Sequence, residues 1–432
     1  MSDVQNLIEK LNAPTSAERL EALRALKKLR DEGAMPVPTR GRDVNNHIHT
    51  CYSFSPYSPT KAVWMADQAG LATAGIMDHD SISGAREFIE AGDILNFPTT
   101  IGAECRASFA GTPLDGRRIN NPDQATVAYV AFHGVPHSRI DALIKFFEPV
   151  RQARAQRNRE MTLRLNTLLE PAGITLDYEN DIVSLSMWNE GGEVTERHLL
   201  FAVATKLLAR FGVGEALVAF LKDTLQIPVS VKAAAQLVDS TNPFVAFDLL
   251  GVLKSDLVEK FYVDATDECL PISEVSAFAK ANGIVLAYAY LGDVTSSVTG
   301  DKKTQAFEDS FLEELFDVLK KTGFSAVTYM PSRNTRDQLV RLRALCDRHG
   351  LFQISGEDIN QPRQKFICEA MRDPFFANLY DAAWALIGHE RLATCTLAEG
   401  MFAPETIALM PSLSERIVHF RDAALDLYHT AD

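Results

Sequence analysis

Residues 44–50 read Val-Asn-Asn-His-Ile-His-Thr, a strand-like run that ends in the histidines His47 and His49. Alternate residues of a β-strand project to the same face, so these two imidazoles lie side by side. Two imidazoles in this arrangement can bind one metal ion without distorting the backbone. The stretch therefore predicts a strand that supplies the first two ligands of a metal site.

Four further polar motifs follow at intervals, most of them where a strand-like run gives way to a turn. They read Met77-Asp78-His79-Asp80, Gly102-Ala103-Glu104, Phe132-His133-Gly134 and Gly356-Glu357-Asp358. Imidazole with carboxylate suits zinc, iron or manganese, and a carboxylate can bridge two ions, which favours Glu104 as a shared ligand. Asp358 is placed to complete the shell of the first ion. We expect these groups to converge at one end of a parallel barrel.

Short apolar runs alternate with amphipathic segments from residue 43 onward, which predicts parallel strands joined by helices. The predicted strands are Val44–His49, Thr73–Met77, Thr99–Ala103, Thr126–Phe132, Ile284–Tyr290, Ala326–Met330 and Leu351–Ser355. Seven strands make a barrel smaller than the usual eight-stranded one.

The alternation lapses into long helical stretches between residues 138 and 266, which predicts a helical domain inserted in a barrel loop as a lid. Helices are expected at Arg139–Leu169, Glu196–Phe211 and Val213–Leu225. The predicted organisation is an N-terminal helical extension (1–40), a first barrel part (41–137), the insertion (138–266), a second barrel part (267–360) and a helical tail (361–432). The segment Thr15-Ser16-Ala17-Glu18 offers a start signal for a helix in the extension. We expect the extension to pack on the main domain; the oligomeric state stays open.

Composition limits the partners. The 432 residues are 46% hydrophobic and carry a formal net charge of −14, which disfavours loose association with nucleic acid or an anionic membrane. The six cysteines include no C-x-x-C pair, which favours reduced thiols in a cytoplasmic protein. The start of the chain lacks the pattern of a signal peptide, and no apolar run approaches the roughly 20 residues of a membrane span. We expect a small phosphorylated substrate and no stable nucleic-acid partner.

The ordered set of motifs resembles the PHP family, named for its polymerase and histidinol phosphatase members. The resemblance covers residues 43 to about 135 and 270 to 360, and it implies a distorted seven-stranded barrel with one to three metal ions. His47 and His49 match the family's H-x-H-T, His79 its D-H-[DN], Glu104 its G-x-E, His133 its fourth histidine, and Asp358 the aspartate of its G-S-D-x-H. The insertion is similar to that of the stand-alone phosphoesterases of the family.

Three positions depart from the family pattern: Phe54, Tyr288 and Asn360 stand where the resemblance implies metal ligands. The first metal site would stay whole, with His47, His49, Glu104 and Asp358 as its ligands. The second would keep Glu104 and His133, and the third only His79. We therefore expect one firmly bound divalent ion (zinc, manganese or iron), with a weakly held second left open and no stable third. A hydrogen-bonded structural role for His133 is an equal alternative.

Other candidate residues would handle the substrate. Arg197 and His198 begin a predicted helix, where unpaired amides favour an anion, and they fall in a Val-Thr-Glu-Arg-His-Leu stretch similar to the family's V-x-R-x-H-[IL]. Arg333 follows a barrel strand and is a second candidate cation for phosphate. His79 or Tyr288 is the candidate proton donor to a leaving oxygen. The alternative for Arg197 is an ion pair on a solvated face.

The leading hypothesis is a metal-dependent phosphoesterase that hydrolyses a small phosphorylated or nucleotide-like substrate with a metal-activated water. The alternative is a degenerate scaffold of the same fold that binds metal and a phosphorylated ligand or partner without catalysis. Hydrolysis of an amide or cyclic imide is a third option, which the order of the motifs disfavours.

Overall fold

A nearly closed, barrel-shaped sheet forms the centre of the computed structural model, which describes residues 3–294 and 305–429. Residues 1–2, 295–304 and 430–432, which belong to the predicted extension, second barrel part and tail, lie outside the described residues. The strands are β1 (Val44–Ile48), β2 (Thr73–His79), β3 (Thr99–Ser108), β4 (Val127–His133), β5 (Leu270–Pro271), β6 (Val285–Ala289), β7 (Ala326–Tyr329) and β8 (Phe352–Ser355). They follow the order β1-β2-β3-β4-β6-β7-β8, with the two-residue β5 paired to β3. The predicted seven-stranded α/β barrel with helical additions is confirmed.

The two edges of the sheet meet just beyond β1 and β8. The amide of His49 donates to the carbonyl of Ile359 (2.9 Å), and the amide of Ile359 donates to the carbonyl of His47 (3.1 Å). The side-chain amide of Asn46 also donates to the carbonyl of Ser355 (2.8 Å). The backbone that carries the two histidines therefore closes the barrel, which brings Asp358 to the same place.

The expectation of uniformly parallel pairing is wrong for β4, which runs antiparallel to both β3 and β6. Residues 109–126 join β3 to β4 without a helix, so the chain returns directly beside the strand it has just left. As a result His133, the last residue of β4, pairs with Val285 at the start of β6. It therefore reaches the barrel interior on a strand that runs opposite to its neighbours, two residues beyond Ala131, the partner of Glu104.

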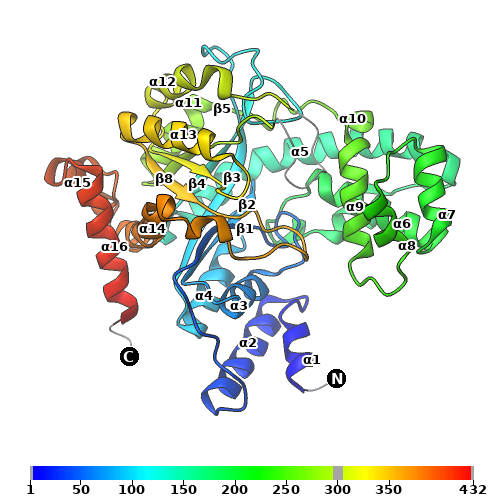
Figure 1. Cartoon of the computed structure of the whole chain (residues 1–432), viewed down its shortest axis with the longest axis horizontal. Coiled ribbons are helices and arrows are strands. Elements are labelled where there is room, and N and C mark those ends of the chain that lie inside the picture. The colour runs from blue at the N-terminus through cyan, green and yellow to red at the C-terminus, as the bar shows by residue number, and fades with distance from the viewer. Residues whose placement is uncertain (1–2, 295–304, 430–432) are drawn as a thin grey trace.

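Helices cover the barrel and extend from it (Figure 1). Those at the N-terminus and around the sheet are α1 (Asp3–Lys10), α2 (Ser16–Asp31), α3 (Pro59–Gln68), α4 (Ala85–Leu95), α11 (Ile272–Ala281), α12 (Leu312–Lys321) and α13 (Arg336–His349). The predicted start of α2 is confirmed: Thr15 and Glu18 form a reciprocal capping box. The α1–α2 pair packs on the barrel core through residues such as Leu23. Among the described helices, none has the length and apolar character needed to cross a bilayer.

The segment between β4 and β5, hereafter the insertion, is helical and lies to one side of the barrel (Figure 1). Its helices are α5 (Ile140–Leu169), α6 (Glu196–Phe211), α7 (Glu215–Ala219), α8 (Val231–Val238), α9 (Val245–Asp256) and α10 (Val258–Phe261). They enclose a hydrophobic cluster separate from the barrel core. The proposed domain boundaries stay predictions.

The C-terminal segment packs against the barrel interior. Its helices are α14 (Ala377–Cys395), α15 (Pro404–Leu409) and α16 (Leu413–His429). Leu386 of α14 and Phe420 of α16 share a buried cluster with inward residues of the strands, among them Met77, Ala131 and Ala287. The tail thus fills part of the barrel interior.

Candidate metal centre

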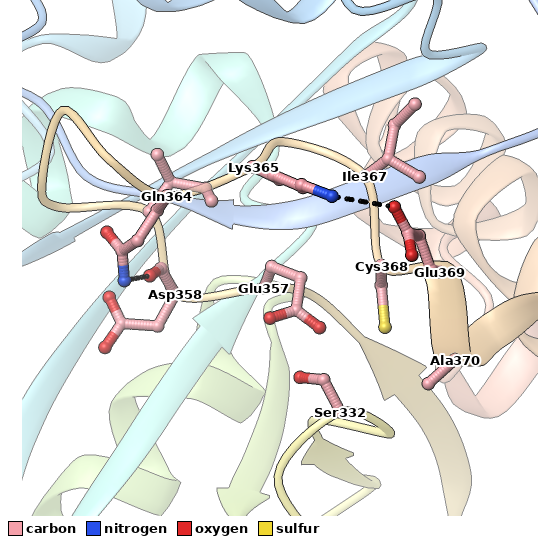
Figure 2. Close-up of a pocket in the computed structure, with 10 residues that line it drawn as sticks. Ser332, Glu357, Asp358, Gln364, Lys365, Ile367, Cys368, Glu369 and Ala370 are labelled. Carbon is pink, nitrogen blue, oxygen red and sulfur yellow. Dashed lines mark hydrogen bonds and ion pairs between the residues drawn. The ribbon is translucent and has the colours of Figure 1, made fainter. Parts of the chain in front are cut away.

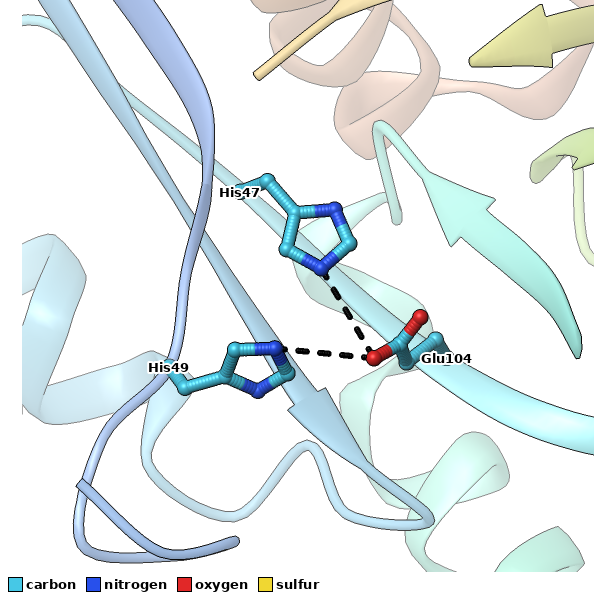
Figure 3. Close-up of side chains that lie close together, drawn as sticks. All are labelled: His47, His49 and Glu104. Carbon is cyan, nitrogen blue, oxygen red and sulfur yellow. Dashed lines mark ion pairs between the residues drawn. The ribbon is translucent and has the colours of Figure 1, made fainter. Parts of the chain in front are cut away.

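His47, His49 and Glu104 bring three potential ligand atoms within 4.8 Å of one another (Figure 3). The Oε1 atom of Glu104 lies 3.6 Å from Nε2 of His47 and 3.5 Å from Nε2 of His49. His49 and Glu104 are only 2% and 7% exposed. The cluster is therefore a nearly enclosed set of donors that is compatible with metal binding.

Strand register sets the positions of these groups. His79 at the end of β2 pairs with Glu104 in β3, and its Nδ1 lies 3.1 Å from the same Oε1 atom. The rings of His79 and His49 are stacked with their centres 4.7 Å apart. The pairing of β1 with β2 shifts by one residue between Asn45 and Ile48, a bulge of the kind that redirects side chains next to functional sites. Glu104 is consequently shared by three imidazoles.

Asp358 joins the cluster from the loop after β8. Its Oδ1 lies 3.2 Å from Nε2 of His49, and its side chain is 37% exposed, which makes it the most accessible of the acidic and imidazole groups here. The side-chain amide of Asn360 donates to the same oxygen. Gln364 folds the loop by donating to the carbonyl of Asp358 (2.7 Å) and accepting from the amide of Asn360 (2.7 Å). Asn360 thus orients the carboxylate of Asp358.

A cavity of about 260 Å³ adjoins Asp358 (Figure 2). Ser332 and Glu357 line it together with Asp358, and the loop of residues 364–370 forms the opposite wall. This cavity supplies space next to the accessible carboxylate.

A buried relay holds the ring of His49, and sequence reasoning did not assign it. Nδ1 of His49 lies 3.2 Å from Oγ of Ser53, whose hydroxyl donates to Asp78 (2.6 Å). Because that proton goes to the carboxylate, Ser53 accepts from the Nδ1–H of His49. In the neutral ring the lone pair is therefore on Nε2, the atom that faces Glu104 and Asp358, whereas the protonated ring donates to Asp358 from that atom. Thr50 donates to Asp78 through its amide (2.7 Å) and its hydroxyl (2.6 Å). The sequence held one signal for this relay, because Asp78 belongs to the motif Met77-Asp78-His79-Asp80.

The electrostatics keep both carboxylates ionised. Burial raises the pKa of Glu104, but the charges of His79, His47 and His49 outweigh it and lower this pKa to about 2. Burial also raises the pKa of Asp358, but the hydrogen bond and charge of His49 hold it well below its usual value. Burial lowers the pKa of His79 to about 3. A neutral imidazole at position 79 therefore faces an anionic Glu104.

His133 lies apart from the three-residue cluster but inside the same barrel. It is 1% exposed, and its Nε2 has no hydrogen-bond partner within the described part of the chain. Burial, followed by the charge of His47, lowers its pKa to about 3. A buried imidazole nitrogen without a partner is uncommon, and it keeps His133 available as a ligand.

The structure does not bring Tyr288 to the cluster. Its hydroxyl donates to Glu308 (3.1 Å), and it packs in the outer core, whereas its neighbour Ala287 belongs to the inner cluster. Successive residues of β6 point to opposite faces, so Tyr288 is directed away from the interior. This placement is a physical reason against Tyr288 as a proton donor, so His79 is the remaining candidate from the sequence analysis.

Several cations surround Asp358. Arg197, the second residue of α6, has a buried Nη1 without a hydrogen-bond partner in the described structure, and its charge acts on Asp358 and Glu104. Arg333 donates to the carbonyl of Leu291 (3.2 Å), and its charge also interacts with Asp358. Lys254 in α9 was not predicted from the sequence as a cation of the site, because it lies outside every motif. The nearby charge of Arg197 is the largest factor that lowers its pKa, to about 8.

His198 has a structural contact instead. Its Nδ1 accepts from the amide of Thr195 (2.9 Å), so it caps the first turn of α6. Its ring lies edge-on to Phe54, with centres 5.0 Å apart. Phe54 therefore contacts the insertion rather than the cluster.

A buried charge network joins the insertion to the barrel. It consists of three guanidiniums and three carboxylates: Arg106, Arg154, Arg157, Asp80, Glu196 and Glu268. Glu196, which precedes Arg197, accepts from all three arginines at 2.7–2.8 Å. Their charges, against the effect of burial, hold the pKa of Glu196 well below its usual value. The start of α6 is therefore fixed next to the cluster.

Comparisons with known proteins give likenesses only at the level of solved structures. No family model matches the sequence, and no curated protein matches it. A proposed metal-dependent phosphoesterase from Bifidobacterium adolescentis aligns with 78% of this chain and 96% of its own, at 20% identity and a TM-score of 0.49. An amidohydrolase from Chromobacterium violaceum, with bound sulfate and no metal, aligns with 76% of this chain and 90% of its own, at 17% identity and a TM-score of 0.48. Neither likeness identifies the reaction.

Proposed function

We propose that this protein is a metal-dependent phosphoesterase that hydrolyses a small phosphorylated or nucleotide-like substrate. The spacing of the donor atoms carries the proposal. Ligand bonds of about 2.0–2.2 Å in a tetrahedral shell place the ligand atoms roughly 3.3–3.6 Å apart. The corresponding distances from His47 to Glu104, His49 to Glu104 and His49 to Asp358 are 3.6, 3.5 and 3.2 Å. The donor set therefore fits a divalent cation.

The charge of the set supports the same conclusion. Glu104 and Asp358 together carry two negative charges, which balance a divalent ion when His47 and His49 are neutral. Zinc, manganese and iron all accept this mixture of nitrogen and oxygen. We propose one firmly bound ion; if a second ion binds, Glu104 and His133 would hold it more weakly. Such an ion supplies Lewis acidity toward a phosphate oxygen and lowers the pKa of a water molecule.

The protein side chains around the cluster suit the remaining tasks. Arg197, Arg333 and Lys254 would bind the phosphate and offset the charge that gathers on its oxygens. His198 would hold Arg197 in place through its cap on α6. His79, whose Nδ1 lies 3.1 Å from Oε1 of Glu104, is the proposed proton donor to the leaving oxygen, a role that its protonated form, favoured by a bound phosphate anion, would fill. The enclosed position of His49 and Glu104 excludes bulk water.

A direct test measures the release of phosphate or alcohol from a panel of mono- and diesters by protein loaded with zinc, manganese or iron. The expected result is turnover that chelation abolishes and that His49→Ala lowers together with the bound metal. His419→Ala, on the exposed side of α16, is the matched control and should retain both. Protein with one bound ion that cleaves no ester of the panel would contradict the proposal.

A metal-binding scaffold without catalysis is the second candidate. One observation favours it: Phe54, Tyr288 and Asn360, at three positions where the family resemblance implies ligands, all make other contacts. The discriminating result is His49→Ala protein that loses its metal and melts at a lower temperature while no reaction of the wild type is found to change.

A further inference from the structure

Phe54 is a barrel residue that belongs to the hydrophobic core of the insertion. Among the buried residues of that cluster it alone comes from outside residues 161–261 of the described structure. Its ring lies 5.0 Å from that of His198, 5.5 Å from Phe201 and 6.1 Å from Phe247, measured between centres. The loop after β1 therefore contacts α6 and α9 through a single aromatic side chain.

The backbone of Phe54 adopts a conformation that a bulky residue rarely takes, with φ at +97°. The surrounding contacts enforce it. The carbonyl of Tyr52 accepts from the amide of Glu193 in the insertion (2.6 Å), and the hydroxyl of Ser53 is committed to Asp78. Strain of this kind persists where neighbouring structure determines it, and it gathers at functional sites.

The contact with His198 gives this ring a consequence for the site. His198 caps the first turn of α6, and Arg197 stands directly before it with an unpartnered, buried Nη1. On the other side of the same turn, Glu196 is held by three arginines. The first turn of α6 thus lies between the buried charge network and the ring of Phe54 and contacts both.

We propose that Phe54 is a positioning residue that sets the guanidinium of Arg197 over the cluster for an anionic phosphate group. This proposal rests on the proposed function, because it takes phosphate as the ligand. The loop after β1 contacts both groups: Ser53 accepts from the ring of His49, and Phe54 contacts α6 of the insertion. One segment of the chain therefore positions the proposed metal ligand His49 and the proposed anion-binding residue Arg197.

The test measures the binding of inorganic phosphate to the metal-loaded protein by calorimetry, with metal content determined on the same samples. Phe54→Ala should weaken phosphate binding by roughly tenfold or more, the effect of losing one charge-assisted hydrogen bond, and leave metal content unchanged. Arg197→Ala should weaken it similarly, and the double variant should bind no more weakly than Arg197→Ala alone. Phe54→Leu, which restores an apolar contact, should recover part of the affinity.

Two further variants separate positioning from general stability. Phe54→Gly removes the ring but tolerates the positive φ, so it should fold well and still bind phosphate as weakly as Phe54→Ala. Phe220→Ala disturbs the same core at a stacked pair with Phe211 (4.5 Å), and it should lower the melting temperature while phosphate affinity stays within about twofold of wild type.

Three results would overturn the inference: wild type that binds no phosphate, Phe54→Gly with wild-type affinity, or losses in Phe54→Ala and Arg197→Ala that add in the double variant. The outcome is separable from that of the proposed function. If Phe54→Ala and Arg197→Ala each weaken phosphate binding and the double variant weakens it no further, but no ester is hydrolysed, only the proposed enzyme activity is refuted. If esters are hydrolysed and Phe54→Gly keeps both this activity and the phosphate affinity of wild type, only the role of Phe54 is refuted.

Discussion

Replacing Ser53 with alanine should weaken metal binding, because it breaks the relay that orients His49. The hydroxyl lies between Nδ1 of His49 (3.2 Å) and a carboxylate oxygen of Asp78 (2.6 Å). Loss of a group that orients a ligand in this way costs 10- to 100-fold in metal affinity, or about 1.4–2.7 kcal/mol. Asp78 keeps both hydrogen bonds from Thr50, so it is not left unpaired. We therefore expect the lower part of this range, about tenfold.

The assay is a titration of metal-free protein with zinc against a competing chelator, together with melting curves in excess chelator. The curves report the separate cost of the lost hydrogen bond to folding, about 1 kcal/mol. Ser55→Ala is the matched control from the same loop, since the hydroxyl of Ser55 is buried without a partner in the described structure. Equal zinc affinity in Ser53→Ala and wild type, or equal losses in both serine variants, would refute the relay.

Three other changes test separate parts of the structure. Gly356→Ala should lower the melting temperature and metal affinity, because a Cβ there would lie 2.6 Å from Cβ of His47; unchanged melting and titration curves would contradict this contact. Glu196→Gln should lower the free energy of unfolding by about 3 kcal/mol in denaturant titrations, since three buried guanidiniums lose a shared carboxylate, and a loss below about 1 kcal/mol would argue against the network. Burial raises the pKa of Glu308 from 4.5 to about 7, so its stabilising contribution is complete below pH 4.5 and is lost as the pH rises through 7. Between pH 5 and 8, the free energy of unfolding should therefore fall by up to about 3 kcal/mol more in wild type than in Glu308→Gln. If it changed equally in both proteins over this range, folded Glu308 would not be holding a proton at these pH values.

The sequence-level patterns predicted the strands and the cluster because both depend on short-range order. The spacing of His47 and His49 needs only a strand, and Asp358 needs only the end of a strand that meets β1 in a barrel. Glu104 was expected just after a strand ending at Ala103, but it lies within β3, which continues to Ser108. The direction of β4 was not predictable from its own residues. It follows from the helix-free connection before it, which reverses the chain, so that His133 ends a strand that runs antiparallel to both of its neighbours.

The remaining features depend on tertiary contacts that carry no periodic signal. Ser53 and Asp78 are 25 residues apart and became partners only when the first two strands paired. Lys254 lies on a helix of the insertion that no motif indicated. Phe54 could be recognised in the sequence as a missing ligand, but its contact with the insertion depends on how α6 packs over the barrel.

The packing of the C-terminal helices limits the directions from which a small molecule can approach the cluster. Leu386 and Phe420 help fill the barrel interior beneath the cluster, while His49 is almost fully covered from the other side. A small molecule would therefore reach and leave the proposed metal ligands beside Asp358, through the cavity lined by Ser332, Glu357 and the loop of residues 364–370. With entry and exit by one route, the rate of exchange would depend on movements of that loop, so solvent viscosity should slow turnover if release is the slowest step.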